Sequence, residues 1–293
     1  MSKIEITNLT KFYGKNMALD NLSLNINENK IYGLLGRNGA GKTTLLNLVT
    51  NKIFPTQGEI KVDSESVSEN ENALRKIYYM TEKNLYPETM KVRDIIKWSG
   101  EFYPDMNSSL ALQLSEKFNL NLNKKFNGLS TGYASILKII LTLSSNAEIL
   151  LFDEPTLGLD ANHRDMFYKE LIHHYGDTPK TIILSTHLIE EIADIIEEVI
   201  IIKNGKLVIK DTTESLLSSG YTISGKAEDV DAFIQNKKVI GTDAIGKFKY
   251  AYVIGTPPSK GSFQVDASEL EITKLDLQKL FIQLTNSYEE VAI

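Results

Sequence analysis

The sequence predicts an α/β fold with a mostly parallel sheet and a small α+β appendage at its C-terminal end. Short apolar runs alternate with helical segments after residue 136, which is typical of a parallel sheet. One apolar run, IYGLL at 31–35, leads through a glycine-rich loop into a segment with helical spacing. Beyond residue 211 the content of Gly, Ser, Thr and Lys rises, which indicates a separate appendage.

The elements follow in order. Residues 1–30 alternate in places and predict antiparallel strands with turns at Tyr13-Gly14 and near Asn29. Residues 88–127 predict helices broken at Pro104 and Asn107. After residue 136 the pattern predicts a helix and then, in order, strand 148–152, helix 162–175, strand 181–185, helix 188–197 and strand 199–203. Asn204-Gly205 predicts a two-residue hairpin turn into KLVIK.

We expect a first domain over 1–212, with a helical subdomain at about 83–140, and an accessory domain over 213–293. The accessory domain contains the strand-like stretches YTISG and KYAYVIG. It ends in a predicted helix with Leu277, Leu280, Phe281 and Leu284 on one face. Thr273 and Asp276 have the spacing of a capping box before this helix.

Composition excludes several classes of protein. The net charge is −6, so no basic surplus indicates a nucleic-acid partner. Cysteine is absent, which excludes disulfides and thiol chemistry. The N-terminal residues lack the apolar core of a signal peptide, and no apolar run approaches the ~20 residues that span a bilayer. We therefore expect no direct membrane insertion.

GRNGAGKT at 36–43 predicts a polyphosphate site, because it follows a strand and opens a helix. Glycines let successive N–H groups curl around phosphates, and the helix N-terminus adds positive partial charge. Lys42 should reach the β- and γ-phosphates, and the Thr43 hydroxyl should bind Mg²⁺. The alternative is an ordinary glycine-rich turn. The predicted nucleotide contacts are Gly36, Asn38, Gly39, Ala40, Gly41, Lys42, Thr43 and Thr44.

Two further strands end in polar side chains. EILLFDEP at 148–155 ends in Asp153, a candidate Mg²⁺ ligand, and Glu154, a candidate base for the attacking water. A helix cap before Pro155 is the alternative. TIILSTHL at 181–188 places His187 past a strand, where it could contact the γ-phosphate. The other three histidines, His163, His173 and His174, are expected on the surface of a helix.

In this order the motifs resemble those of the ATP-binding subunits of ABC transporters, over residues 2–211. GRNGAGKT resembles Walker A, ILLFDE resembles Walker B, LGLD at 157–160 resembles the D-loop and STH at 185–187 the switch histidine. LSTGY at 129–133 falls where the family has its signature, LSGGQ. LSTGYAS, YYMTE and the appendage most resemble the bacitracin-exporter group of Gram-positive bacteria. A weaker resemblance is to a staphylococcal exporter of amphipathic peptide toxins.

The resemblance implies a P-loop NTPase fold of the ABC type and ATP hydrolysis with Mg²⁺ as cofactor. It implies that Tyr13 stacks on adenine and that Asp160 belongs to the nucleotide site. It also implies that two such chains pair head to tail, as a homodimer or a heterodimer. Ser130 and Gly132 of one chain would then reach the γ-phosphate bound by the other. A separate transmembrane permease would hold the chain at the cytoplasmic face of the membrane.

Two motifs depart from the family pattern near the phosphates, at three residues in all. Thr131 and Tyr133 stand where the signature has Gly and Gln, and Glu82 stands where the family usually has Gln. Glu82 can still be a Mg²⁺ ligand, but it adds a negative charge. We therefore expect slow or partner-dependent ATP hydrolysis. The residues after Glu82 are expected to face the permease, through the exposed candidates Leu85, Tyr86, Trp98, Phe102 and Tyr103.

The leading hypothesis for function is a motor that energises export of drugs or peptides. A soluble ATPase acting on ribosomes or DNA is an alternative, but the chain has one ATP site and no long coiled coil between the Walker motifs. A regulatory module that uses ATP only as a switch is the third. Glu154 and His187 disfavour the switch, while Thr131 and Glu82 favour it mildly.

Overall fold

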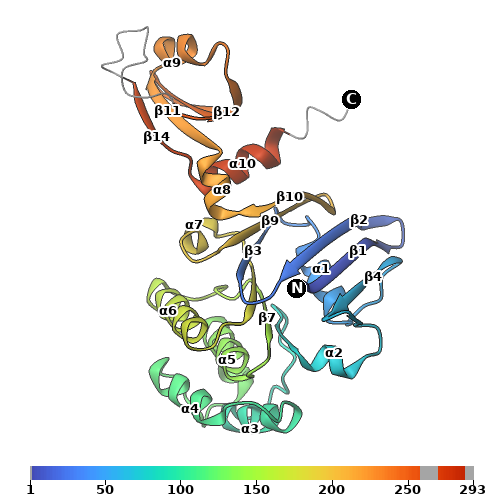
Figure 1. The fold of residues 1–293 in the computed structure, drawn as a ribbon. Coiled ribbons are helices and arrows are strands. Elements are labelled where there is room, and N and C mark those ends of the chain that lie inside the picture. The colour runs from blue at the N-terminus through green and yellow to red at the C-terminus, as the bar shows by residue number, and fades with distance from the viewer. Residues whose placement is uncertain (1, 258–269, 288–293) are drawn as a thin grey trace. The chain divides into compact units, whose positions relative to one another are not determined.

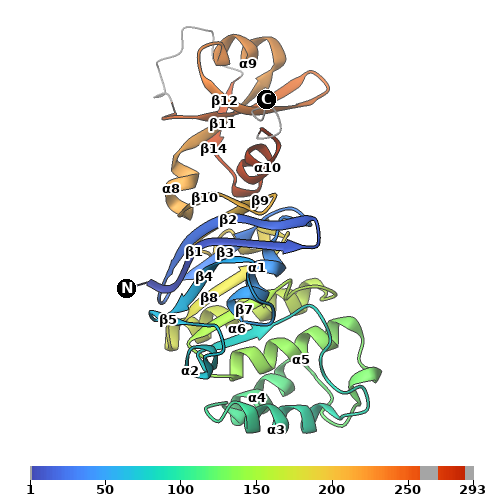
Figure 2. The same cartoon turned by 90° about the vertical axis from the view of Figure 1, so that its right-hand side faces the viewer.

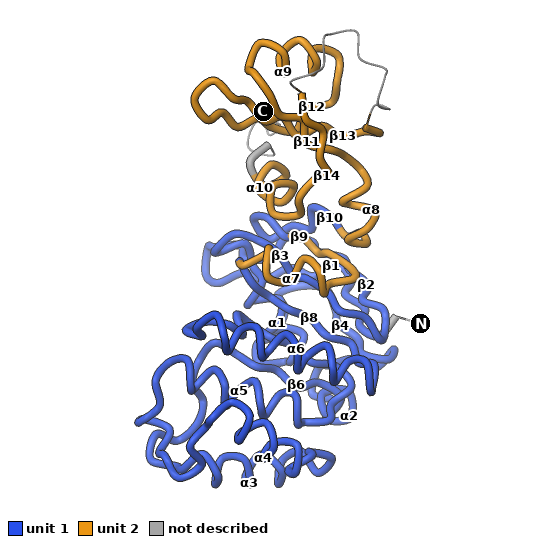
Figure 3. The backbone as a smooth tube through the Cα atoms, turned by 90° about the vertical axis from the view of Figure 1, so that its left-hand side faces the viewer, with its two compact units in different colours: residues 1–187, 202–209 blue, residues 188–201, 210–293 orange. Residues whose placement is uncertain are grey.

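The computed structural model describes residues 2–257 and 270–287, which form two compact units (Figure 1). Figure 3 colours them separately: unit 1 comprises residues 1–187 and 202–209, and unit 2 comprises 188–201 and 210–293. The limit between the units falls inside two strands, β9 (Glu198–Lys203) and β10 (Lys206–Thr212). The domain limits predicted from composition stay a prediction.

The predicted parallel sheet is confirmed. Four strands of unit 1 pair in parallel, and the full sheet has the order β10-β9-β3-β8-β7-β6. Strands β3, β7 and β8 are buried along their whole length, which explains why their sequences are uninterrupted apolar runs. Their bounds, with that of β6, are Ile31–Leu35 for β3, Ile77–Met80 for β6, Ile149–Asp153 for β7 and Thr181–Ser185 for β8.

A second, antiparallel sheet contains the N-terminal strands, as predicted. Its order is β2-β1-β4-β5. The turn between β1 and β2 uses Gly14 at φ 60°, a left-handed conformation that suits glycine. Helix α1 contacts β2 of this sheet and β7 of the parallel sheet, and Figure 2 shows it between them. The strand bounds are Ser2–Tyr13 for β1, Asn16–Asn27 for β2, Gln57–Val62 for β4 and Glu65–Ser66 for β5.

Helices α3, α4 and α5 pack on one another and form the helical part of unit 1 (Figure 1). Ser130 caps α5, and the apolar run that follows is buried, since α5 also contacts α6 and β6. The predicted break between α3 and α4 is confirmed. The helix bounds are Lys42–Val49 for α1, Glu71–Arg75 for α2, Val92–Phe102 for α3, Ser108–Lys117 for α4, Thr131–Ser144 for α5 and Ala161–Asp177 for α6.

Unit 2 contains an antiparallel sheet in the order β12-β13-β11-β14. Helix α9 packs on β11 and β13 over a small core that includes Tyr221, Ile223, Val230 and Val253. No described helix of either unit is both long and apolar enough to cross a bilayer. The bounds are Ile189–Ile192 for α7, Thr213–Ser218 for α8, Gly220–Lys226 for β11, Ala227–Ile234 for α9, Lys238–Ile245 for β12, Phe248–Ile254 for β13, Glu271–Lys274 for β14 and Leu277–Ser287 for α10.

Two local predictions are wrong. The helix predicted over 188–197 ends at Ile192, and beyond it the chain forms only a turn, in which the Ile192 carbonyl accepts the N–H groups of Ile195 at 3.0 Å and Ile196 at 3.1 Å. The capping box before α10 does not form. Asp276 itself caps that helix by accepting the Lys279 N–H at 2.9 Å, while Thr273 lies in β14 and pairs with β11.

We expect Phe152→Ala to lower the free energy of unfolding of unit 1 by about 3–5 kcal/mol, because Phe152 is fully buried in β7 against Phe167. The exposed Phe54 is the matched control, and Phe54→Ala should change it by less than about 0.5 kcal/mol. Urea denaturation followed by the fluorescence of Trp98, the single tryptophan, reports on unit 1. Equal effects of the two substitutions would contradict the assignment of β7 as the core strand.

Candidate functional site

The candidate site is a pocket of about 750 Å³ in unit 1. Much of its lining comes from the segments that follow the carboxyl ends of four parallel strands, β3, β6, β7 and β8, where α/β sheets bind their ligands. The rest comes from β1, β2 and the turn between β9 and β10. Of the predicted site residues, those that line the pocket are Tyr13, Asn38, Gly39, Ala40, Gly41, Lys42, Thr43, Thr44, Glu82, Asp153, Glu154 and His187.

The loop of residues 36–43 can adopt its path only with glycine at several positions. Gly39 and Gly41 have φ angles of 82° and 109°. A side chain at Gly36 would place its Cβ 2.6 Å from the Ile202 carbonyl oxygen, and one at Gly41 would lie 2.8 Å from that of Ala18. The backbone therefore comes close to its neighbours and curves tightly before α1. This leaves the N–H groups at the helix start as an anion-binding edge.

Lys42 is buried at the start of α1, and its Nζ donates a hydrogen bond to the Gly36 carbonyl at 2.6 Å. Burial lowers the pKa of the Lys42 ammonium, while the charges of Glu154 and Asp153 oppose that shift. The side chain thus sits within the electrostatic reach of both acids that follow β7. A cation at this position complements a polyphosphate.

Asp153 is the most connected polar group of the site, and it is only 1% exposed. Its Oδ2 accepts hydrogen bonds from the Thr43 hydroxyl at 2.8 Å and the Tyr79 hydroxyl at 3.1 Å. Its Oδ1 accepts one from the Ser185 hydroxyl at 3.0 Å. Burial raises the pKa of Tyr79, and the Asp153 charge raises it further, so Tyr79 remains a donor. Three elements far apart in the sequence thus hold one carboxylate in place.

The donor set fits Mg²⁺. Thr43, Asp153 and Glu82 offer one hydroxyl and two carboxylates to the same pocket. Within the described residues, no group of three or more His, Cys, Asp or Glu side chains could hold a metal ion by itself. Mg²⁺ is usually bound through one or two carboxylates together with substrate phosphates, so this incomplete oxygen set suits it.

Glu154 contacts His187 directly. Its Oε2 lies 2.8 Å from His187 Nδ1, and because a carboxylate only accepts, the ring nitrogen donates. The Thr186 hydroxyl is 3.4 Å from the same oxygen. Glu154 has a left-handed backbone at φ 50°, and its N–H bonds the Ser185 carbonyl at 2.8 Å. A carboxylate held in this way at the pocket edge can accept a proton from water.

The remaining predicted residues, Gly36, Ser130, Gly132 and Asp160, are not among those that line the pocket. Ser130 is exposed at the start of α5, where its Oγ accepts the Tyr133 N–H at 3.3 Å. Gly132 approaches the loop of residues 157–160 so closely that a Cβ would lie 2.5 Å from the Gly158 carbonyl oxygen. The Ser135 hydroxyl donates to the Leu157 carbonyl in the same contact, at 2.9 Å.

Two of the histidines predicted on the surface, His163 and His174, are partly buried instead. His163 Nδ1 donates to Asp160 at 2.9 Å, and its ring lies 5.9 Å from that of Tyr133 and 6.2 Å from that of Phe118, measured between ring centroids. Its backbone N–H also bonds Asp160, and these contacts lower the pKa of the Asp160 carboxyl. His163 therefore connects the α5 start to the loop that carries Asp160.

Tyr13 stands half exposed at the pocket rim, with Lys11 Nζ 5.2 Å from its ring centroid. A half-exposed aromatic ring at this point can receive a flat base. The exposed side chain of Met17 lines the same side of the pocket.

Several lining residues were not predicted, namely Asn16, Met17, Ala18, Leu157 and Asn204. Asn204 belongs to the predicted hairpin turn, whose Gly205 N–H bonds the Ala40 carbonyl at 3.0 Å. The Asp20 N–H bonds the Gly205 carbonyl, also at 3.0 Å. The turn signal was visible in the sequence, but its contact with the phosphate loop is a property of the fold alone.

The expected exposed aromatics are only partly exposed. Tyr86 packs edge-on against Phe126 with ring centroids 5.5 Å apart, and burial raises the pKa of Tyr86 to about 12. Tyr103 lies 4.7 Å from the ring of Tyr78 and is likewise half-buried. These two side chains pack within the chain instead of facing solvent. Leu85, Trp98 and Phe102 are exposed as expected.

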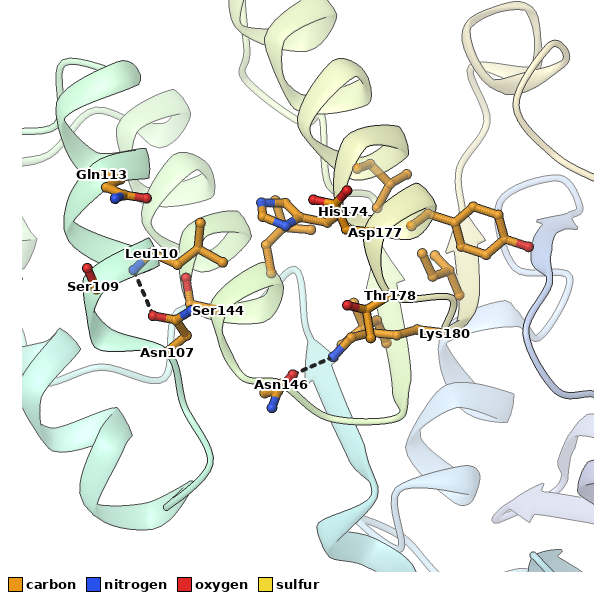
Figure 4. A pocket seen from close by; sticks show the side chains of 15 residues that line it. Asn107, Ser109, Leu110, Gln113, Ser144, Asn146, His174, Asp177, Thr178 and Lys180 are labelled. Carbon is orange, nitrogen blue, oxygen red and sulfur yellow. Dashed lines mark hydrogen bonds between the residues drawn. The ribbon is translucent and has the colours of Figure 1, made fainter.

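A second cavity of unit 1, of about 350 Å³, lies among residues of α4, α5 and α6 (Figure 4). It contains the two buried atoms Ser144 Oγ and His174 Nε2, for which the described residues provide no hydrogen-bond partner. Lys180 bonds Asn146 at its edge, at 3.1 Å. The glycine-rich loop and the carboxylates of Asp153 and Glu154 line the larger pocket instead.

Comparison with known proteins agrees with the geometry. The ABC transporter family model matches residues 19–157. The chain is 33% identical to the bacitracin transport ATP-binding protein BcrA of Bacillus licheniformis, over 70% of this chain and 68% of that protein. It is 30% identical to the lantibiotic transport ATP-binding protein SrtF of Streptococcus pyogenes, over 73% of this chain and 93% of that protein.

A solved ATP-binding cassette, described as a dimer in a post-hydrolysis state with ADP and Pi, has a TM-score of 0.63 and 26% identity. The alignment covers 72% of this chain and 98% of that one. The fold, the phosphate loop beside a carboxylate-ended strand and these relatives point to the same family. The chain belongs to the ATP-binding subunits of ABC transporters, and it is an ATPase.

Proposed function

We propose that the large pocket of unit 1 binds Mg²⁺-ATP and that Glu154 and His187 direct the water that attacks its terminal phosphate. The observation that carries this proposal is the 2.8 Å contact between the Glu154 carboxylate and His187, beside the phosphate loop. Glu154 accepts the proton of the attacking water, and His187 fixes the orientation of that carboxylate. Phosphoryl transfer depends mainly on such positioning and on charge stabilisation.

The other pocket residues bind different parts of Mg²⁺-ATP in this proposal. The glycine-rich backbone and Lys42 hold the phosphates, and Tyr13 stacks on the adenine. Thr43, Asp153 and Glu82 would hold Mg²⁺, which would supply positive charge to neutralise the phosphates. The hydroxyls of Tyr79 and Ser185 keep the Asp153 carboxylate in one orientation, so that little reorganisation is needed when the nucleotide binds.

A second chain completes each site in this proposal. Ser130 and Gly132 are absent from the pocket lining of their own chain, although Ser130 is exposed at a helix N-terminus, a position suited to an anion. A head-to-tail pair brings this end of α5 to the γ-phosphate of the partner chain. Asp160 arrives with it, because Gly132 and His163 link the α5 start to the loop of Asp160.

The pair of ATPase chains works on a membrane permease at the inner face of the cell membrane. The bacitracin and lantibiotic relatives support export of drugs or peptides as the process that ATP hydrolysis drives. The weaker resemblance to a staphylococcal exporter of amphipathic peptide toxins makes amphipathic peptides the proposed cargo. Leu85, Trp98 and Phe102 form the proposed docking surface for the permease, and Phe102 is 70% exposed.

We expect Glu154→Gln to reduce ATP turnover by at least about 100-fold, because the amide cannot accept the proton of the attacking water. ATP binding should persist, and the variant should accumulate as an ATP-bound dimer in size-exclusion chromatography. The same column run with ADP is the control and should show less dimer. Unchanged turnover would remove Glu154 from its proposed role and would favour the ATP-switch alternative.

A mixing experiment tests whether the site is shared between chains. Ser130→Glu should abolish turnover by setting a negative charge against the γ-phosphate, and Lys42→Ala should abolish it by weakening phosphate binding. Each variant alone is inactive, but a mixed dimer retains one complete site, so mixing should restore up to about a quarter of the wild-type rate.

Ser108→Glu is the matched control for that experiment, since it adds the same charge at the exposed start of α4 and should leave turnover unchanged. If the mixture stays as inactive as its components, Ser130 does not act on the phosphate of a partner chain.

If Leu85, Trp98 and Phe102 form the docking surface, substituting them should weaken permease binding and leave ATP turnover of the isolated chain unchanged. Trp98→Ala combined with Phe102→Ala should weaken binding to the permease at least about tenfold, since exposed aromatic anchors dominate such interfaces. ATP turnover of the isolated chain should stay within about twofold of wild type, because neither side chain lines the pocket. Ile172→Ala, at an exposed residue of α6, is the control in the same pull-down assay. Intact permease binding in the double variant would exclude this surface.

A further inference from the structure

Lys138 is a buried cation in the third turn of α5, and it is only 7% exposed. Its Nζ donates hydrogen bonds to two consecutive backbone carbonyls, that of Thr81 at 3.1 Å and that of Glu82 at 2.8 Å. Burying an ammonium group is costly unless specific partners compensate for the lost water. Here the partners belong to one short segment that follows β6 and leads into the pocket.

The contact of Lys138 with Thr81 and Glu82 joins two different parts of the site. Helix α5 begins at Ser130, and Lys138 lies eight residues further on, about 12 Å along the axis of a rigid helix. Thr81 and Glu82 follow directly after β6, and Glu82 lines the nucleotide pocket. One side chain therefore joins the helix that presents Ser130 to the segment that presents Glu82.

The charge of Lys138 also interacts with acids that line the pocket. Glu82 and Asp153 are the acids whose charges attract its ammonium, and both line the pocket. Asp153 already accepts hydrogen bonds from Thr43, Tyr79 and Ser185. A buried cation behind two neighbouring carboxylates reduces their mutual repulsion, and low local polarity makes such charges act strongly.

We propose that Lys138 is a positioning residue of the ATPase: its two hydrogen bonds hold the Glu82 segment against α5, and its charge offsets that of the Glu82 carboxylate. The proposal rests on the role given above to Glu82 as a ligand of Mg²⁺. It also explains how a carboxylate is accommodated beside phosphates and Asp153. Movement of α5 during pairing of two chains is then transmitted to Glu82 through one side chain.

A purely structural role predicts a different outcome. It predicts that removing the Lys138 donor, which leaves the Thr81 and Glu82 carbonyls without it, lowers stability and leaves the kcat of the folded protein unchanged. Lys138→Met keeps the length of the side chain and removes both the charge and the hydrogen bonds. A positioning role predicts, in addition, loss of activity in the protein that remains folded.

Lys180 provides the matched control. It is also a partly buried lysine of unit 1, and its Nζ donates to the Ala147 carbonyl at 2.9 Å and to Asn146 at 3.1 Å. Burial lowers the pKa of Lys180, so its environment resembles that of other buried lysines. It does not line the nucleotide pocket. Lys180→Met thus also removes hydrogen bonds of a partly buried lysine, but at a residue that does not line the nucleotide pocket.

The experiment compares the full-length wild type with Lys138→Met, Lys180→Met, Glu82→Gln and the Glu82→Gln/Lys138→Met double variant. Steady-state ATPase assays give kcat and KM, calorimetry gives ATP affinity with and without Mg²⁺, and thermal unfolding gives Tm. We expect Lys138→Met to lower kcat about tenfold at a temperature well below its Tm, where the variant is folded. Lys180→Met should change kcat by less than about twofold.

The coupling to Glu82 is the decisive readout. The measured quantity is the ratio of ATP affinity with Mg²⁺ to ATP affinity without it. Lys138→Met should reduce this factor at least about threefold, because the Glu82 carboxylate loses its fixed place. In the Glu82→Gln background, adding Lys138→Met should reduce the factor no further and should lower kcat by less than about threefold.

Equal losses of kcat in both backgrounds would overturn the proposal, and so would a Lys138→Met variant that behaves like Lys180→Met. If Lys138→Met does not fold, Lys138→Gln replaces it, since the amide retains a donor without the charge and is expected to give the same Glu82-dependent loss. If Glu82→Gln alone leaves the effect of Mg²⁺ on ATP affinity unchanged, the metal role of Glu82 fails. In that case the kcat of Lys138→Met still tests whether Lys138 connects α5 to the Glu82 segment.

Discussion

The buried carboxylate of Asp153 is the interaction on which the rest of the site depends. It lies at the end of β7 and binds a hydroxyl from α1, one from β6 and one from β8. Each of these bonds fixes the end of one element relative to the others, and together they align the phosphate loop with the segments of Glu82 and His187. A buried charge requires such partners, and here the same partners assemble the pocket.

Sequence reasoning succeeded where the chemistry is contiguous. The residues of 36–43 form a site because neighbouring backbone groups curve around one anion, and Asp153-Glu154 follow a single strand. Strands β3, β7 and β8 were predicted with nearly their observed bounds, because a strand buried on both faces leaves an unbroken apolar run. Short elements such as β5 and α2 carry too few residues for a period to be recognised.

The contacts that support the site could not be predicted in this way. Tyr79 is 74 residues from Asp153 and Lys138 is 56 residues from Glu82, so only the fold brings them together. The same reason explains why Tyr86 was expected to be exposed, since an aromatic side chain in a polar segment can pack on a distant helix. His163 shows the opposite case: it has no partner at metal-ligand spacing, yet it bonds Asp160 only three residues away, at the start of α6.

The close approach of α5 to the loop after β7 constrains how this sequence can vary over evolutionary time. Gly158 has φ 78°, and a methyl group of Thr131 occupies the space that a side chain at residue 158 would need. The larger residue in the first turn of α5 is therefore compatible with the fold only while its neighbour stays a glycine. Gly132 has no such freedom, because its own Cβ would collide with backbone. Gly132 is thus a position of this turn that cannot accept a side chain, whereas the residues on either side of it are Thr131 and Tyr133 in this chain.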